Sequence, residues 1–218
     1  MPDSPAVRVK ICGVTRAADA LAAVNAGAAY VGVVFASGPR VIAVGDAGRI
    51  AAAVVGVPVF GVFGSQSVDE ILAITREAGL AGAQLHGPYR RQDAARLRAE
   101  GLLVWRVVRI AQPGDLDTLA DSVRDADAVL VEPRVPQAAG GSGISLDMAV
   151  AREARARLAG ATMVLAGGLT PESVAAAVGL VRPEVVDVSS GVECLPGVKD
   201  PDKIARFVEA VFGHSAIP

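Results

Sequence analysis

A thiol directly after a short apolar segment is the first candidate for chemistry in this chain. Cys12 follows residues 7–11, whose alternating apolar positions predict a strand, and Gly13 after it permits a sharp turn. A thiol can act at neutral pH when a proton acceptor is present or when its pKa is lowered from about 8.5. Arg40 or a helix N-terminus could lower it. Cys12 is therefore a candidate catalytic residue, and its alternative role is that of a small core residue.

Three further side chains that could catalyse a reaction or bind a substrate also follow predicted strands. Glu132 follows residues 128–131, and a carboxyl group at the end of a buried strand can have a raised pKa and donate a proton. His86 can orient a substrate, and Arg40 can bind a substrate carboxylate through two hydrogen bonds. The ordinary alternatives are a solvated loop carboxylate for Glu132, a turn cap for His86 and a surface side chain for Arg40.

Two segments of small residues near the C-terminus are candidates for binding a phosphate group. Glycines let the backbone approach a ligand closely, and free N–H groups in such loops can hold a phosphate. Ordinary turns into helices are the alternative. The candidates are Gly167 and Gly168 after residues 162–166, and Asp187, Ser189 and Ser190 at the end of residues 185–188.

Several other charged residues receive structural interpretations. Lys10 lies two positions before Cys12, so strand alternation puts both side chains on one face. A Schiff-base role for Lys10 is disfavoured because nothing nearby is clearly placed to deprotonate it. Lys199 and Asp200 are predicted to open the last helix, and Asp19 is predicted to lie on a solvated helix face.

These side chains need a scaffold that brings the ends of several strands together. About eight apolar runs, most of them rich in β-branched residues, alternate with segments of helical spacing, as in a compact (β/α)₈ barrel. The chain of 218 residues is thus predicted to be a single α/β domain, a TIM barrel over residues 1–218. A doubly wound open sheet is the alternative, because alternation alone does not show closure. The expected strands are residues 7–11, 30–35, 59–63, 81–85, 102–108, 128–131, 162–166 and 185–188.

The barrel prediction gives the candidate residues a common location. Strand ends and the loops after them form the active face of such barrels, and the loops after strands seven and eight commonly hold phosphate. Residues 133–145, which are rich in glycine, are predicted to form a loop able to cover the site.

Composition excludes several classes of function. A net charge of −2 argues against a broad surface for nucleic acid or anionic lipid, and no apolar run approaches the ~20 residues of a membrane span. The two cysteines lie far apart in sequence, which is typical of the reducing cytoplasm. With two histidines and no paired-ligand spacing, no metal site is expected. The usual glycine-rich nucleotide motifs are missing as well.

Taken in order, the strand-end segments resemble the phosphoribosylanthranilate isomerase family, barrel enzymes of tryptophan biosynthesis. The resemblance covers nearly the whole chain, and its first and last motifs are specific in combination. The segments that carry it are residues 10–15 (KICGVT), 32–40, 84–87 (QLHG), 166–171 (AGGLTP), 187–193 (DVSSGVE) and 196–200 (PGVKD).

The resemblance implies an Amadori rearrangement of a phosphosugar, without a cofactor, in a monomer or homodimer. It implies that Cys12 is the general base at the sugar C2 position and that Arg40 binds the anthranilate carboxylate. Glu132 stands where the family has an aspartate that serves as the general acid. The residues implied around the substrate and its phosphate are His86, Gly167, Gly168, Asp187, Ser189 and Ser190.

Two departures from the family pattern keep alternatives open. The first is Glu132 in place of aspartate, and the second is the segment at residues 146–148 (LDM), where the family usually has Phe-Asp-Trp. A divergent paralogue acting on another phosphosugar or aryl-amine adduct is one alternative. A phosphosugar-binding barrel without catalysis is the other.

Overall fold

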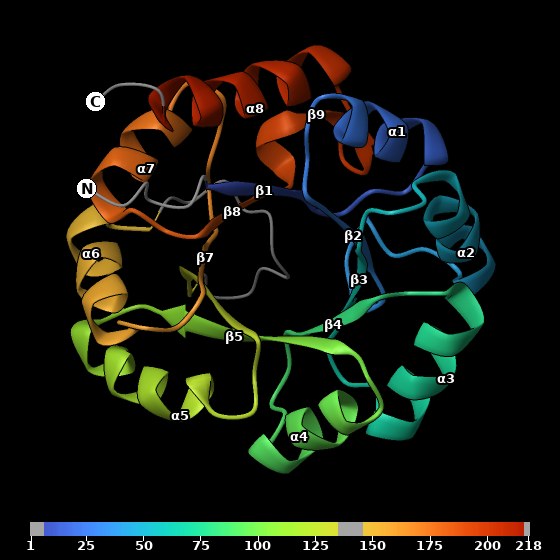
Figure 1. Cartoon of the computed structure of the whole chain (residues 1–218), viewed down its shortest axis with the longest axis horizontal. Coiled ribbons are helices and arrows are strands. Elements are labelled where there is room, and N and C mark those ends of the chain that lie inside the picture. The colour runs from blue at the N-terminus through green and yellow to red at the C-terminus, as the bar shows by residue number, and fades with distance from the viewer. Residues whose placement is uncertain (1–6, 135–145, 216–218) are drawn as a thin grey trace.

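The computed structural model describes residues 7–134 and 146–215, and eight parallel strands in these ranges close into a barrel. Neighbours in sequence pair side by side, and β8 pairs with β1 to complete the ring. Figure 1 shows the ring of strands from one end, enclosed by the helices. Closure confirms the predicted (β/α)₈ barrel and excludes the open sheet. The strands are β1 (Arg8–Ile11), β2 (Tyr30–Val34), β3 (Val59–Phe63), β4 (Gly82–Leu85), β5 (Leu103–Ile110), β6 (Ala128–Pro133), β7 (Met163–Leu165) and β8 (Val185–Val188).

Helices follow the strands and cover the outside of the barrel. The predicted loop over residues 133–145 lies almost entirely outside the described residues. None of the described helices is long and apolar enough to cross a membrane. The helices are α1 (Ala17–Asn25), α2 (Val44–Ala53), α3 (Val68–Ala78), α4 (Arg91–Ala99), α5 (Leu119–Val123), α6 (Met148–Arg157), α7 (Val174–Val181) and α8 (Pro201–Ser215), with 3₁₀ turns η1 (Pro113–Thr118) and η2 (Ser190–Val192).

Local sequence signals set the ends of several helices. α3 begins with a capping box, in which the Ser67 side chain accepts from the Glu70 N–H and the Glu70 carboxylate accepts from the Ser67 N–H. It ends at Gly79, whose φ of 63° is the left-handed conformation of a helix C-cap. α6 begins after Asp147, whose carboxylate accepts from the N–H groups of Ala149 and Val150.

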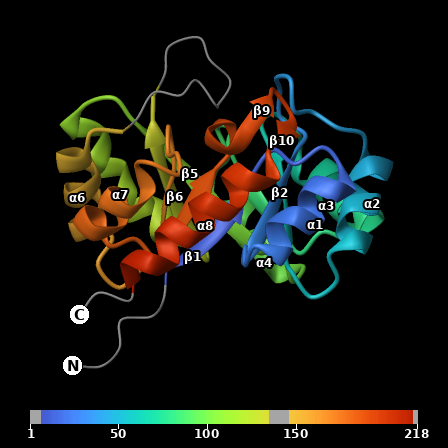
Figure 2. The ribbon, with the colours of Figure 1, turned by 90° about the horizontal axis from the view of Figure 1, so that it is seen from above.

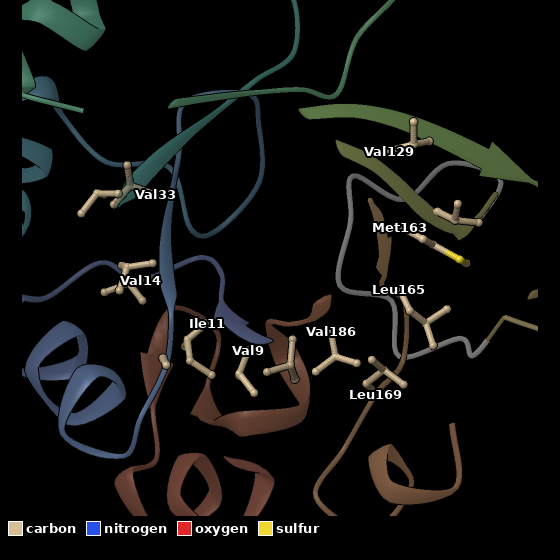
Figure 3. Close-up of a cluster of buried hydrophobic side chains, with 14 of the residues drawn as sticks. Val9, Ile11, Val14, Val33, Val129, Met163, Leu165, Leu169 and Val186 are labelled. Carbon is tan, nitrogen blue, oxygen red and sulfur yellow. The ribbon is translucent and has the colours of Figure 1, made fainter. Parts of the chain in front are cut away.

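Alternation along β1 separates the hydrophobic layer from the barrel interior. Val9 and Ile11 belong to the large buried cluster that also includes Val186 of β8 and Phe207 of α8. Figure 3 shows Val9, Ile11 and Val186 on the side of their strands that faces the helices. Residues of the opposite parity, such as Lys10, project into the barrel, as the spacing of Lys10 and Cys12 predicts.

A second buried cluster fills the barrel interior. Trp105 and Phe60 pack with ring centroids 4.4 Å apart, and Tyr30 meets both rings edge to face. A side chain at Gly82 would lie 2.4 Å from the Phe60 ring, so the glycine makes room for the aromatic residue. The aliphatic members of this cluster are Ala128, Leu130, Val164, Ala166 and Val185.

β5 and β6 extend further than the sequence predicts. Their ladder continues through the pairs Arg109 with Glu132 and Ile110 with Pro133. Glu132 and Arg109 therefore lie inside strands rather than directly after them, because backbone pairing persists although the side chains are polar. Strand geometry thus fixes both side chains more rigidly than a loop would.

A short hairpin after β8 corrects two predictions. β9 (Glu193–Leu195) pairs antiparallel with β10 (Val198–Lys199), so Lys199 ends a strand and does not open α8. Asp200 does cap α8, since its carboxylate accepts from the N–H groups at positions 202 and 203. Asp19 is 3% exposed rather than solvated, because its carboxylate accepts from the Lys199 N–H.

Candidate active site

A cavity of about 330 Å³ lies at the C-terminal ends of the barrel strands. Figure 2 shows the β6 arrow pointing toward the end of the barrel at which β9 and β10 lie. The volume is in the range of small-molecule sites. Residues from seven of the eight strand ends and the loops after them line it: Cys12, Val34, Ala36, Ser37, Arg40, Val62, Gly64, Ser65, Gln84, His86, Gly87, Arg109, Glu132, Asp187 and Ser189.

Cys12 is buried at one wall of the cavity, next to a charged pair inside the barrel. The fully buried Lys10 donates to Asp187 at 2.9 Å and to Gln84 at 2.8 Å. A side chain at Gly32 would lie 2.8 Å from the Cys12 sulfur and 3.2 Å from Lys10 Cε. The glycine of β2 therefore leaves the space in which the thiol and the lysine meet.

Charge and burial act in opposite directions on this thiol. Burial raises the pKa of Cys12, and the neighbouring Lys10 and Lys199 ammonium groups oppose the rise without reversing it. Lys10 stays protonated because Asp187 and Cys12 raise its pKa against the effect of burial. A protonated amine is unsuited to forming a Schiff base, which agrees with the sequence interpretation of Lys10.

Glu132 enters the cavity from β6 and forms a cluster with Arg109 of β5 and His86, which directly follows β4. Arg109 Nε donates to Glu132 Oε1 at 2.9 Å, and His86 Nε2 lies 3.2 Å from the same oxygen. Burial raises the pKa of Glu132 although Arg109 lowers it. The raised pKa agrees with the prediction, and it favours the protonated form that a general acid needs.

His86 is held as a neutral ring. Burial first, and then the charges of Arg109 and Lys10, lower its pKa to about 4. Its Nδ1 is the one buried side-chain nitrogen or oxygen without a hydrogen-bond partner in the described part of the chain. A neutral imidazole beside Glu132 can donate or accept a hydrogen bond with a ligand, and it adds no charge to the cavity.

Arg40 lines the cavity and already has a partner. Its Nε and Nη2 donate to the two carboxylate oxygens of Glu193 at 2.8 and 2.7 Å. Lys199 Nζ donates to the same carboxylate at 2.8 Å. Arg40 is therefore not a free surface side chain, which was the alternative that the sequence left open. Part of its guanidinium is already bound to Glu193 and is not available to a substrate carboxylate.

The two predicted phosphate loops contact each other beside the cavity. A side chain at Gly191 would lie 2.0 Å from the Leu169 carbonyl oxygen, and one at Gly167 would lie 2.1 Å from Pro133. Gly167 and Gly168 both have positive φ, of 95° and 68°. Of the predicted phosphate-binding residues, Asp187 and Ser189 line this cavity, whereas Gly167, Gly168 and Ser190 do not belong to its lining.

The structure adds partners that sequence reasoning missed. The sequence alone assigns no role in the site to Arg109, Glu193 or Lys199. Arg109 and Glu132 stand at the ends of neighbouring predicted strands, which could have indicated their contact. No spacing rule, however, links Arg40 to Glu193, which lies 153 positions later. No group of three or more His, Cys, Asp and Glu residues that could hold a metal occurs in the described ranges.

Comparisons with known proteins agree with this geometry. Residues 9–210 match the family described as N-(5'-phosphoribosyl)anthranilate (PRA) isomerase. The N-(5'-phosphoribosyl)anthranilate isomerase of Paracoccus denitrificans is 44% identical over 213 residues, which are 93% of this chain and 96% of that protein.

Solved structures extend the similarity to three dimensions. Monomers of the dimeric phosphoribosylanthranilate isomerase of Thermotoga maritima are 37% identical, with a TM-score of 0.82 over 95% of this chain and 99% of that chain. A phosphoribosyl anthranilate isomerase in complex with reduced 1-(o-carboxyphenylamino)-1-deoxyribulose 5-phosphate is 36% identical, with the same TM-score and coverage.

Proposed function

The chain belongs to the N-(5'-phosphoribosyl)anthranilate isomerase family, and on this premise we propose the reaction that it catalyses. The substrate is N-(5'-phosphoribosyl)anthranilate and the product is 1-(2-carboxyphenylamino)-1-deoxyribulose 5-phosphate, in tryptophan biosynthesis. The observation that carries the residue assignment is the placement of Cys12 and Glu132 on one cavity, from β1 and β6. The catalytic unit in this proposal is the whole chain, residues 1–218, as one barrel.

The first step opens the ribose ring. Glu132 donates its proton to the ring oxygen, the bond between this oxygen and C1 breaks, and the nitrogen lone pair forms a C1=N iminium bond. The raised pKa of Glu132 supports this role, because the carboxyl group keeps its proton closer to neutral pH. Arg109 and His86 hold the carboxyl group in place.

The second step moves a proton at carbon. The Cys12 thiolate removes the C2 proton, the C–H electrons form a C1=C2 bond, and the iminium electrons return to nitrogen. The resulting enolamine tautomerises to the C2 ketone with a new proton at C1. Burial raises the pKa of the Cys12 thiol and Lys10 next to the sulfur opposes this rise, while the iminium charge acidifies the C2 proton.

The remaining contacts bind the two anionic ends of the substrate. Arg40 binds the anthranilate carboxylate, and the segments that contain Gly168 and Ser189 bind the phosphate. The contact between these two segments at Gly191 supports this assignment, because it makes them one continuous small-residue surface beside the cavity.

Growth of a tryptophan auxotroph that lacks this isomerase tests the proposal. The wild-type gene is expected to restore growth, and Cys12→Ala at equal expression is expected not to. Failure of the well-expressed, folded wild-type protein would contradict the proposal and favour a paralogue or a binding protein.

The assembly and the location of the protein complete the proposal. A homodimer is supported by the dimeric relative from Thermotoga maritima, and a monomer is the alternative. Light scattering of the purified protein distinguishes them. A cytoplasmic location stays a prediction from the cysteine content.

A further inference from the structure

The hairpin of β9 and β10 presents one carboxylate whose contacts are almost complete. Both oxygens of Glu193 accept from Arg40, and Oε1 also accepts from Lys199 Nζ at 2.8 Å and from the Gly197 N–H at 3.2 Å. The side chains of Glu193, Arg40 and Lys199 are 5%, 11% and 0% exposed. Such a buried, multiply bonded group is held in one orientation.

The pairing uses only one edge of the Arg40 guanidinium. Nε and one hydrogen of Nη2 face Glu193, and within residues 7–134 and 146–215 no acceptor faces either hydrogen of Nη1 or the second hydrogen of Nη2. These donors form a second edge that can bind another planar carboxylate with two hydrogen bonds. Arg40 also lines the cavity, so a ligand there can reach it.

The stem of Arg40 is held from the other side by the backbone after Cys12. A side chain at Gly13 would lie 2.4 Å from Arg40 Cδ, so the arginine passes directly over this glycine. Gly13 has φ of 69°, a conformation that favours glycine. The direction of the guanidinium is thus determined by Gly13 at the stem and Glu193 at the head.

Lys199 gives the cluster its charge and its link to the β8 loop. Arg40, Glu193 and Lys199 together carry one net positive charge, which favours an anionic ligand group. Lys199 Nζ also donates to the Ser189 carbonyl oxygen at 3.0 Å. The hairpin therefore connects the arginine with a segment that we assign to the phosphate.

We propose that Glu193, held by Lys199, is a positioning residue that presents the free edge of Arg40 to the aromatic carboxylate of the substrate. This arrangement makes the enzyme selective for aryl-amine adducts that carry an ortho carboxyl group. The inference rests on the proposed function and adds to it the residues that set its substrate preference. The competing arrangement is an exchange in which the substrate displaces Glu193 from Arg40.

Two substrates that differ only in the carboxyl group test the proposal. The probes are the phosphoribosyl adducts of anthranilate and of aniline, assayed with the wild-type protein and Glu193→Gln. We expect the variant to raise KM for the anthranilate adduct about 10- to 100-fold, the range for a lost charge-assisted contact. Its kcat for this adduct, and its kcat/KM for the aniline adduct, are expected to change about twofold or less.

A matched control removes a comparable ion pair elsewhere. Glu184 accepts from Arg155 at 2.7 Å and from the Met163 N–H at 2.8 Å, at the start of β8 and away from the cavity. Glu184→Gln is expected to leave the preference between the two adducts unchanged. If Glu193→Gln does not fold, Glu193→Asp replaces it, with a smaller rise in KM confined to the anthranilate adduct.

Three results would overturn the inference. Unchanged kinetics with both adducts in the folded variant would show that Glu193 does not position Arg40, and a lower KM would show that it competes with the substrate. Equal losses for both adducts would indicate a merely structural role. Failure of the wild-type protein to convert either adduct would instead refute the proposed function.

Discussion

The ion pair inside the barrel yields a prediction for stability that the structure makes quantitative. Lys10 is fully buried, its Nζ lies 2.9 Å from Asp187 Oδ1, and the Asp187 side chain is only 9% exposed. Lys10→Met keeps the aliphatic stem but leaves the carboxylate and the Gln84 oxygen without their donor. Breaking a buried pair in this way costs about 3–5 kcal/mol, out of a total of about 5–15 kcal/mol for a typical domain.

The assays are thermal and urea unfolding, applied first to Lys10→Met and then to a double variant. At about 2–4 °C per kcal/mol for a chain of this size, the single variant is expected to melt roughly 6–20 °C lower. Lys10→Met with Asp187→Asn is expected to recover at least half of the lost free energy, because no charge is then left unpaired. Glu172→Gln, which removes an exposed pair with Arg206, is the control and is expected to change stability by about 0.5 kcal/mol or less.

The pH dependence of this pair follows from the direction of the pKa shift. Burial lowers the pKa of Lys10, but Asp187 and Cys12 together raise it by more than burial lowers it. The folded-state pKa therefore lies above the ordinary 10.5. The contribution of Lys10 is therefore fully present below pH 10.5 and is lost as the pH rises through the folded-state value. A loss under 1 kcal/mol in Lys10→Met at pH 7, or no recovery in the double variant, would refute this reasoning.

Three further predictions concern the cavity and its loops. Glu132→Gln is expected to lower kcat about 10²- to 10⁴-fold at an unchanged melting temperature, since the amide oxygen can still accept from Arg109, and a retained kcat would exclude the acid role. NMR of ¹⁵N-labelled histidine should show His86 titrating near pH 4, with stability falling as the pH drops from 6.5 toward 4, whereas titration near 6.5 would contradict its burial. Gly167→Ala should lose more stability than Gly56→Ala in urea unfolding, because both have positive φ but only Gly167 faces a neighbour at 2.1 Å; equal losses would show that this contact is unimportant.

Local patterns in the sequence were sufficient to predict the barrel and the shared location of several site residues. Alternation of apolar and helical segments is a local signal, and strand parity alone places Lys10 and Cys12 on one face. Parallel strands put their C-terminal ends together, so Cys12, His86 and Glu132 could be expected at one cavity. The structure confirms that these three side chains line it.

What escaped prediction depends on contacts that no local pattern encodes. β5 and β6 continue through Arg109 and Glu132 because each pairs with the other, although polar residues in a single strand indicate an end. The burial of Lys199 depends on the fold of the β9–β10 hairpin, which places its ammonium against Glu193.

The most direct test of the central claim is the single-turnover rate with substrate that carries deuterium at C2. Cys12 is proposed to remove this hydrogen, so the wild-type protein should form product more slowly from the deuterated than from the protiated substrate. Cys12→Ala, with an unchanged melting temperature, should form no product above the uncatalysed rate. Product formation by folded Cys12→Ala at the wild-type rate would contradict the account.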